Sequence, residues 1–582
     1  MMFRSFLVAS GALALGACAP AALSPAAPSV IQSGPAPSAQ PFTGAVASAD
    51  PRATAAGEAM LAQGGSATDA AIATMIALTV VEPQSSGIGG GGFIVHGTPA
   101  GDVVTYDGRE TAPAAAKPDW FLDAQGNGLP FGDVVLTGLS IGVPGNIAVA
   151  KLAHDAHGKL PWAMLFEPAI RLAREGFTVN ERLNQSLDGY AHRAGLTEAG
   201  KATFYAGSDT PRAVGTRIVQ VELANSLEQI ASGGPDAFYR GSFAQGLASR
   251  VAAATPGEAR MTSADITGYE AKMRRPVCGD YRGYKVCGMG PPSSGGVAVL
   301  QILEQLERFD LAALGPQSIT AWHLFVEAQR LAYADRELYI GDADFVEVPT
   351  DGLVDPAYLL TRSQLIDPAR RLNEVAPGRP PGAPQARAVG EAFPESGTSH
   401  LVAIGADGTM VSYTTTIEGA FGSGHMYGGF YLNNELTDFS FAPAEHGRPV
   451  ANRVEGGKRP RSSMAPTIVY DPAGKPLLAL GAAGGPTIPI QTARSIIGVI
   501  DFGLGLEDAL ALPMIMSFGD RLIVEEGSWL AKSIPQLQAL GHEQVVASGF
   551  LFRTNGAMRT AQGWKAAFDP RLVPLLATTK DN

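Results

Sequence analysis

Glu395-Ser-Gly-Thr-Ser-His-Leu-Val-Ala-Ile404 is the stretch that decides the fold. A segment rich in Pro, Gly, Ala and Arg (376–387) precedes it, and a β-type apolar run follows the Gly397-Thr398 step at once. Gly admits backbone geometries that other residues resist, and the Thr398 hydroxyl can attack the Gly397 carbonyl. Cleavage there leaves Thr398 with a free α-amine, of pKa near about 8, beside its own hydroxyl. The sequence therefore predicts a self-cleaving chain with nucleophile and base on one residue; the alternative for these residues alone is a plain strand start.

A β-hairpin is predicted directly after this step. An apolar run and a run rich in Val, Tyr and Thr flank Asp407-Gly408, a strong two-residue turn signal. Folding about that turn places Thr398 opposite Ile417 and Ser399 opposite Thr416. We therefore expect Thr416 near the Thr398 hydroxyl, although the Thr-rich run is also explained by strand propensity alone.

Further motifs follow one another along the chain, each of them a weak signal alone. They are Gly64-Gly65 with Thr68-Asp69-Ala70-Ala71, Val81-Glu82-Pro83, Asp107-Gly108-Arg109-Glu110, Pro291-Pro-Ser-Ser-Gly-Gly296, Gly397-Thr398-Ser399-His400, Leu432-Asn433-Asn434-Glu435, Lys458-Arg-Pro-Arg-Ser-Ser-Met464 and the run 481–485. In this order and spacing, over residues 46–571, they resemble the γ-glutamyltranspeptidases, which are self-cleaving N-terminal-nucleophile hydrolases.

The resemblance implies the catalytic roles. Thr398 matches the nucleophile and new N-terminus, and Thr416 matches the second threonine that orients it. Gly484 and Gly485 match the backbone N–H pair of the oxyanion hole, a task that suits consecutive glycines because bare backbone can direct two donors at one oxygen. Outside the family context, Gly-Gly is equally well explained as a turn.

The resemblance also implies a substrate pocket with two sides. Arg109, Ser462 and Ser463 match the residues that hold an α-carboxylate, and Glu435 and Asp438 match those that hold an α-ammonium. Arg suits the first task because its guanidinium is a fixed, always-charged fork of donors. Glu418 departs from the family, which usually has Asn there, and the segment 439–461, which includes a lid in many members, is short. Both departures bear on the acyl group and on the choice between water and an acceptor amine.

The implied fold is α+β, a four-layer αββα sandwich of the N-terminal-nucleophile type. Residues 45–397 would form a large chain, with 376–397 a flexible linker before the cut, and residues 398–582 a small catalytic chain. The two chains would be each other's partner as a heterodimer.

The N-terminus predicts export. Residues 1–18 have one Arg and a short apolar run, as in a secretory signal, and Leu15-Gly16-Ala17-Cys18 resembles a bacterial lipobox with Cys18 lipidated. Cleavage after Ala19 is the alternative. The Ala/Pro/Ser-rich residues 19–44 are predicted to be a tether. The expected location is the periplasm, held to the membrane by the lipid.

Cysteine placement and charge restrict the possible partners. Cys278 and Cys287 are directly opposed if Arg282-Gly283 is a hairpin turn, which predicts a disulfide in an exported protein. Net charge of −12 without a basic run argues against nucleic acid and anionic membrane surfaces. No metal and no cofactor are expected.

The implied activity is that of a γ-glutamyltransferase or glutathione hydrolase, with glutathione and γ-glutamyl amides as substrates. A glutaryl or cephalosporin-type acylase and a polyglutamate depolymerase are alternatives on the same scaffold. A distant alternative is a serine hydrolase, because Gly138-Leu-Ser-Ile-Gly142 is a literal G-x-S-x-G after a strand-like 133–136, with Ser140 as nucleophile and His542 completing a triad. Pro144 and the missing βαβ alternation argue against it. A non-catalytic lipoprotein would require an intact Gly397-Thr398 junction.

Overall fold

The computed structural model describes residues 44–207, 209–384, 387–390, 397–549 and 553–579. The predicted signal, Cys18 and residues 19–43 of the predicted tether lie outside them, and Gly44, the last tether residue, already opens strand β1. None of the helices described has the length and apolar character needed to cross a bilayer.

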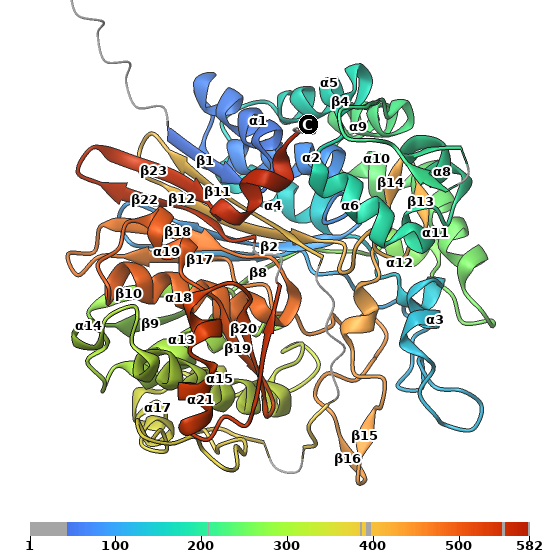
Figure 1. Cartoon of the computed structure of the whole chain (residues 1–582). Helices are drawn as coiled ribbons and strands as arrows, with labels where there is room; N and C mark the ends of the chain where they lie inside the picture. Colours follow the sequence, from blue (N-terminus) through green and yellow to red (C-terminus); the bar gives the residue numbers. More distant parts are fainter. Residues whose placement is uncertain (1–43, 208, 385–386, 391–396, 550–552, 580–582) are drawn as a thin grey trace, which may run out of the picture. The chain divides into compact units, whose positions relative to one another are not determined.

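Two six-stranded antiparallel sheets dominate the described part of the chain (Figure 1). In spatial order, the first contains β1 (Gly44–Ser48), β11 (Ser399–Gly405), β12 (Met410–Thr416), β2 (Gly91–Gly97), β3 (Val103–Asp107) and β8 (Lys272–Arg274). The second contains β23 (Gly563–Phe568), β22 (Asn555–Thr560), β18 (Pro476–Gly481), β17 (Thr467–Tyr470), β10 (Tyr284–Gly288) and β9 (Val277–Tyr281).

The two sheets pack on each other and helices cover their outer faces. Strands β11 and β12 contact β18 and β22 of the second sheet. Helices α1 (Pro51–Ala62) and α2 (Ala67–Val81) lie on the first sheet, while α13 (Gly295–Leu306) and α18 (Ile488–Ile500) lie on the second, with α15 (Ile319–Tyr339) against α13 (Figure 1). Every residue of β2, β11 and β12 is buried. The chain is therefore α+β, and its central strands are enclosed on both faces.

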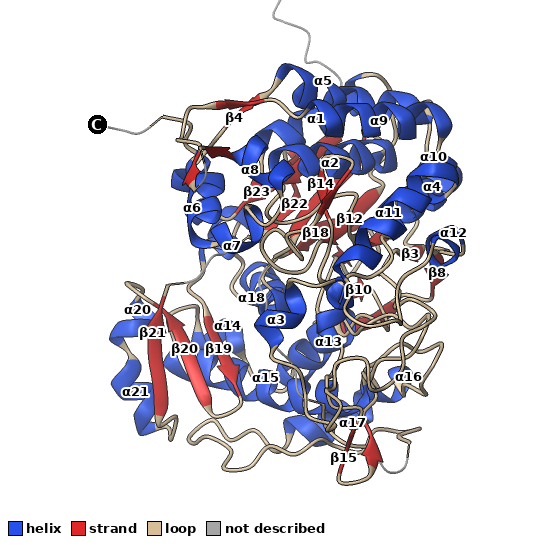
Figure 2. Cartoon of the chain, turned by 90° about the vertical axis from the view of Figure 1, so that its right-hand side faces the viewer, coloured by secondary structure: helices blue, strands red, loops and turns tan. Residues whose placement is uncertain are grey.

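The remaining elements surround this core. The longer helices are α4 (Asn146–His157), α5 (Glu167–Glu175), α6 (Glu181–Gly189), α9 (Val221–Gly233), α11 (Gly241–Ala254) and α17 (Pro356–Ser363). A smaller sheet of β19 (Ile515–Phe518), β20 (Arg521–Glu525) and β21 (Gln544–Ser548) stands apart from the two large ones (Figure 2).

The first motif of the chain forms the junction between α1 and α2. Gly64 takes a positive φ of 82°, which favours glycine, directly after α1. Ser66 then caps α2 through a reciprocal capping box with Asp69. Asp69 also accepts from the backbone N–H groups of Lys159 and Leu160, so this buried carboxylate ties α2 to the loop after α4.

The hairpin after Thr398 exists, but the predicted register is wrong by one residue. Ser399 pairs with Thr415 rather than with Thr416, because the turn has three residues, closed by Gly408 at φ 87° and by the Gly405 N–H donating to the Thr409 carbonyl. Continuing the observed register by one step sets Thr416, not Ile417, across from Thr398.

Cys278 and Cys287 are paired residues of the β9–β10 hairpin and are joined by a disulfide with an S–S distance of 2.07 Å. The turn residues Arg282 and Gly283 both have positive φ, 56° and 80°, which is the conformation of the tight turns that favour hairpins.

The structure contradicts the serine-hydrolase alternative. The expected strand 133–136 falls in helix α3 (Phe131–Val135), and Ser140 is in a short 3-10 helix. Ser140 is fully buried and its hydroxyl donates to the carbonyls of Val135 and Thr137 at 2.9 and 2.8 Å. His542 is instead hydrogen-bonded to His323 at 2.8 Å. A serine without exposure or a base at hand cannot serve as a nucleophile.

Candidate active site

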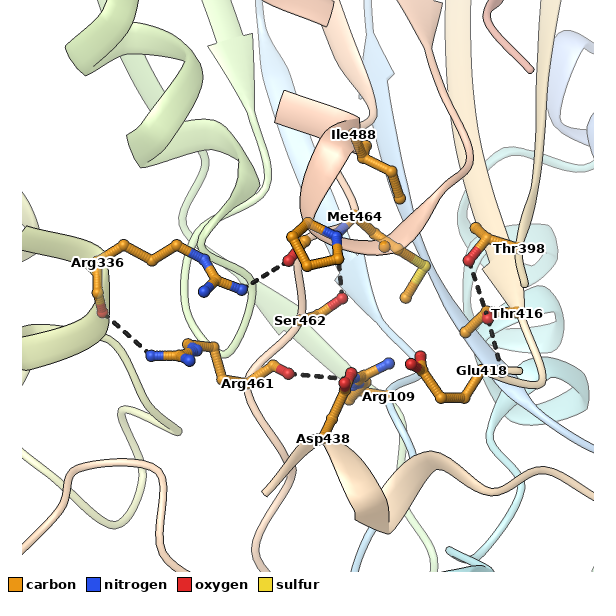
Figure 3. Close-up of a pocket in the computed structure, with 13 residues that line it drawn as sticks. Arg109, Arg336, Thr398, Thr416, Glu418, Asp438, Arg461, Ser462, Met464 and Ile488 are labelled. Atoms are coloured by element: carbon orange, nitrogen blue, oxygen red, sulfur yellow. Dashed lines mark hydrogen bonds and ion pairs between the residues drawn. The ribbon is translucent and has the colours of Figure 1, made fainter. Parts of the chain in front are cut away.

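The Thr398 hydroxyl is held by Thr416. Thr398 directly precedes β11 and its side chain donates from Oγ1 to Thr416 Oγ1 at 3.1 Å (Figure 3). The Thr416 oxygen also accepts from the backbone N–H of Glu418 at 2.8 Å. Because two donors fix the Thr416 oxygen, it in turn fixes the orientation of the Thr398 hydroxyl.

The peptide bond before Thr398 lies in a strained, crowded stretch of backbone. Thr398 has a φ of 88°, which is a genuine outlier for a β-branched residue and costs on the order of 1–3 kcal/mol. A Cβ on Gly397 would lie 1.6 Å from the carbonyl oxygen of Glu418. Only glycine fits at 397, and the strain is located where the sequence predicts cleavage.

The backbone around this bond is held from three directions. The Thr398 N–H donates to the carbonyl of Ser85 at 2.9 Å. The guanidinium of Arg553 donates to the carbonyls of Thr398 and Gly397, both at 3.0 Å. Ser399 donates from Oγ to the Glu82 carboxylate at 2.6 Å, which gives the Val81-Glu82-Pro83 motif a structural role.

A pocket opens in front of Thr398 and contains most of the predicted site residues (Figure 3). Of the predicted residues it is lined by Arg109, Thr398, Thr416, Glu418, Asp438, Ser462, Ser463 and Gly485; its further lining includes Arg336, Arg461, Met464, Pro486 and Ile488. Glu435 lies behind this lining, paired with Arg109. Gly484 directly precedes Gly485. The structure thus brings together residues that are up to 376 positions apart in sequence (109 to 485).

Arg109 is the buried cation of the pocket. Its guanidinium forms ion pairs with Glu435 and Asp438 and donates to the carbonyls of Pro460 and Arg461 at 3.1 and 3.0 Å. Burial opposes its charge, but the surrounding carboxylates, led by Glu435, raise the pKa of Arg109 above its ordinary value. Arg109 is therefore a permanent positive charge.

A group of carboxyls faces that charge. One carboxylate oxygen from each of Glu418, Glu435 and Asp438 lies within 4.8 Å of the other two. Burial raises the pKa of Glu435 and of Asp438 despite Arg109, and it raises the pKa of the adjacent, fully buried Glu110 to about 8. Burial and the like charge of neighbouring carboxylates both disfavour the ionised form of these groups, whereas Arg109 favours it.

The two predicted serines line the other side of the pocket. Ser463 Oγ accepts from Arg336 at 2.6 Å, and Ser462 Oγ accepts from the backbone N–H of Met464 at 3.1 Å. Each hydroxyl can therefore still donate a hydrogen bond through its own proton to a substrate carboxylate.

The predicted oxyanion loop has the required backbone form. Gly484 and Gly485 have φ values of 128° and 56°, a region that favours glycine. The Thr487 hydroxyl and N–H both donate to the Gly484 carbonyl, at 2.9 and 3.2 Å, and hold the loop at the start of α18. Gly485 lines the same pocket as Thr398.

Several functional residues were missed from the sequence. Arg336 and Arg461 both pair with Glu337 beneath the serines, and Arg553 and Ser85 hold the scissile bond. Charged residues within the otherwise apolar helix α15 were an available signal for Arg336 and Glu337. Arg553 has no local signal, because it is an isolated Arg before a strand.

Comparison with known proteins gives the class of this chain, which is an enzyme family of hydrolases and transferases. The family model for gamma-glutamyltranspeptidase matches residues 53–574, and the chain belongs to this family. It is 38% identical over 547 residues to the glutathione hydrolase proenzyme of Escherichia coli, covering 91% of this chain and 90% of that one. It is 34% identical over 544 residues to the acylase ACY 1 proenzyme of a Pseudomonas species, covering 90% and 93%.

A solved acylase structure is also similar to this chain. The crystal structure of cephalosporin acylase from Bacillus halodurans superposes with a TM-score of 0.79 at 27% identity, covering 93% of this chain and 97% of that one. The family of this chain is therefore established, and within it both glutathione hydrolases and acylases are similar to this chain.

Proposed function

We propose that this chain is a self-cleaving γ-glutamyl hydrolase or transferase that acts on glutathione and γ-glutamyl amides through a threonyl acyl-enzyme. The observation that carries the proposal is the pairing, in one pocket with Thr398, of a buried cation with a group of carboxyls. Arg109 and the serines suit an α-carboxylate, and Glu418, Glu435 and Asp438 suit an α-ammonium. A γ-glutamyl group has both charges at the end remote from its γ-carbonyl.

The proposed mechanism follows from the position of Thr398. After cleavage its free α-amine takes the hydroxyl proton, and Oγ1 bonds to the γ-carbonyl carbon. Gly484 and Gly485 stabilise the oxyanion with backbone N–H groups. The C–N bond breaks as the amine leaves with the proton. Water or an acceptor amine then attacks the ester, its proton passing to the α-amine, and Thr398 is released.

The proposed product is a heterodimer of residues 45–397 and 398–582, and the sheet order supports its persistence. In the first sheet, β11 and β12 of the small chain lie between β1 and β2 of the large chain. In the second, β17 of the small chain pairs with β10 of the large chain. Cutting one peptide bond leaves both ladders intact, so we expect the chains to remain associated.

A glutaryl or cephalosporin-type acylase is the second candidate. The likeness to the Bacillus halodurans acylase favours it, and Glu418 departs from the Asn that is usual in the family. A glutaryl group keeps the terminal carboxylate for Arg109 but lacks the ammonium. The three carboxyls Glu418, Glu435 and Asp438 would then face no cation of the substrate. A polyglutamate depolymerase shares the γ-glutamyl end and differs only in the leaving group.

Three anilides distinguish the γ-glutamyl enzyme from the acylase. We expect γ-glutamyl-p-nitroanilide to be cleaved at least about 100-fold faster, in kcat/KM, than glutaryl-p-nitroanilide, which lacks the ammonium, and 4-aminobutyryl-p-nitroanilide, which lacks the carboxylate. Thr398→Ala should remain a full-length chain on a denaturing gel and cleave none of them. A preference for the glutaryl donor would make the chain an acylase, and an active uncut chain would refute the threonine mechanism.

Export and lipidation remain proposals that rest on the N-terminal sequence. Cys18 is proposed to carry lipid and to hold the enzyme at the periplasmic face of a membrane. Mass spectrometry of the exported protein tests this, because an N-terminus at Pro20 would reject the anchor.

A further inference from the structure

Arg553 binds the carbonyl on which the self-cleavage reaction would develop charge. It lies just before β22, and its Nη2 donates to the Gly397 carbonyl oxygen at 3.0 Å. Its Nη1 donates to the Thr398 carbonyl at 3.0 Å and to Ser85 Oγ at 3.2 Å. One guanidinium thus spans the carbonyls on both sides of Thr398 N, and only the Gly397 carbonyl is the target of the Thr398 hydroxyl.

Arg553 holds its charge in a buried position beside a second cation, Arg182. Arg553 is 2% exposed. Glu82, a carboxylate near Arg553, forms an ion pair with Arg182 and accepts from Ser399 Oγ. Burial, and next Arg182, lower the pKa of Arg553 to about 9, so it is protonated at neutral pH. A buried guanidinium beside a second cation gains most from negative charge that appears on an oxygen already within hydrogen-bonding distance.

We propose that Arg553 is a catalytic residue of self-cleavage, which stabilises the oxyanion formed on Gly397 when Thr398 attacks. The inference rests on the proposed cleavage at this bond. The Thr398 Oγ1–C bond to Gly397 forms, the carbonyl π electrons move to the oxygen beside Arg553, and the hydroxyl proton passes to the departing nitrogen. The C–N bond then breaks and leaves an ester with a free α-amine. Water adds to the ester through the same oxyanion and yields the Gly397 carboxylate and the Thr398 hydroxyl.

This role is separate from that of Gly484 and Gly485. Their loop borders the pocket in front of Thr398, where a substrate carbonyl is expected. The Gly397 carbonyl instead accepts a hydrogen bond from Arg553, which lies just before β22 of the second sheet. The chain therefore has two oxyanion sites around one hydroxyl, one for its own peptide bond and one for the substrate.

Purified precursor of the full chain, followed on a denaturing gel, tests the proposal. Loss of one oxyanion donor typically slows acyl transfer by about 10²–10³-fold, so we expect Arg553→Met to cleave at least about 100-fold more slowly than wild type. Arg553→Lys, which keeps the charge, should cleave at an intermediate rate. In Arg553→Ala, added ethylguanidinium should restore cleavage at least tenfold, whereas the same concentration of sodium chloride should not.

Arg494→Met is the matched control. Arg494 is also fully buried and donates to backbone carbonyls, those of Leu510 and Leu512, within the packing of α18. We expect this variant to cleave at the wild-type rate. Wild-type cleavage by Arg553→Met, equal slowing in Arg494→Met, or no rescue by ethylguanidinium would each overturn the role. A wild-type chain that stays uncut would instead refute the proposed function itself.

Discussion

Gly397→Ala is the sharpest test of the junction geometry. The added Cβ would lie 1.6 Å from the Glu418 carbonyl oxygen and 2.6 Å from its carbonyl carbon, whereas ordinary contact begins at 3.4 Å. Both neighbouring atoms are backbone, so the junction must shift by about 1.8 Å to relieve the contact. A misplacement of about 1 Å can cost about 100-fold in rate, because the attacking and attacked atoms leave their reactive arrangement.

We therefore expect Gly397→Ala to cleave at least about 100-fold more slowly than wild type while remaining folded. The assay is a time course of precursor loss on a denaturing gel, with melting temperature measured in parallel. Gly132→Ala is the control, since nothing lies within 4 Å of a Cβ at that position. Cleavage of Gly397→Ala at the wild-type rate would show that the tight approach of Glu418 does not position the scissile bond.

Three further outcomes follow from the site and the hairpin. Arg109→Gln leaves buried Glu435 without its cation. We expect kcat/KM for γ-glutamyl-p-nitroanilide to fall by an amount that corresponds to about 2–5 kcal/mol of lost transition-state stabilisation, and an unchanged kcat/KM would refute the role of Arg109 in substrate binding. Burial raises the pKa of Glu435 and of Asp438, and a protonated carboxyl holds a substrate ammonium less strongly than a carboxylate does. The rate ratio of γ-glutamyl to glutaryl donors should then rise from pH 6 to pH 8.5, and a flat ratio would contradict the assignment. Replacing both disulfide cysteines by Ser should lower the free energy of unfolding by about 2–3 kcal/mol, given the short closed loop, as measured by urea titration.

Local signals in the sequence predicted the elements that local chemistry decides. The predicted hairpin turn at Arg282-Gly283 and the predicted opposition of Cys278 and Cys287 are both present. The hairpin register was missed by one residue because Asp407-Gly408 serves equally well in a two- or a three-residue turn. That choice depends on how the paired strands pack, which the turn sequence alone does not contain.

The residues that hold the scissile bond were beyond sequence reasoning for a different reason. Arg553 and Ser85 meet Thr398 only because strands from the two sheets and the loop after α2 converge there. Neither has a spacing that relates it to Thr398. The charges within α15 mark Arg336 as a candidate, but only the fold shows that it reaches Ser463.

Glu418 links the two proposed reactions of this chain. Its φ of 71° turns its backbone so that the N–H donates to Thr416 Oγ1 while its carbonyl oxygen closes on Gly397. Its side chain lines the pocket beside Arg109 (Figure 3). Positive φ is more accessible to Asn than to Glu, so the carboxylate is present here at a cost in backbone energy. Under the proposed function, the backbone of Glu418 would therefore serve cleavage of the precursor, and its carboxyl would serve the substrate pocket. Because the two tasks use different atoms, substrate preference can change at this position without loss of self-cleavage, as expected in a family that includes both glutathione hydrolases and acylases.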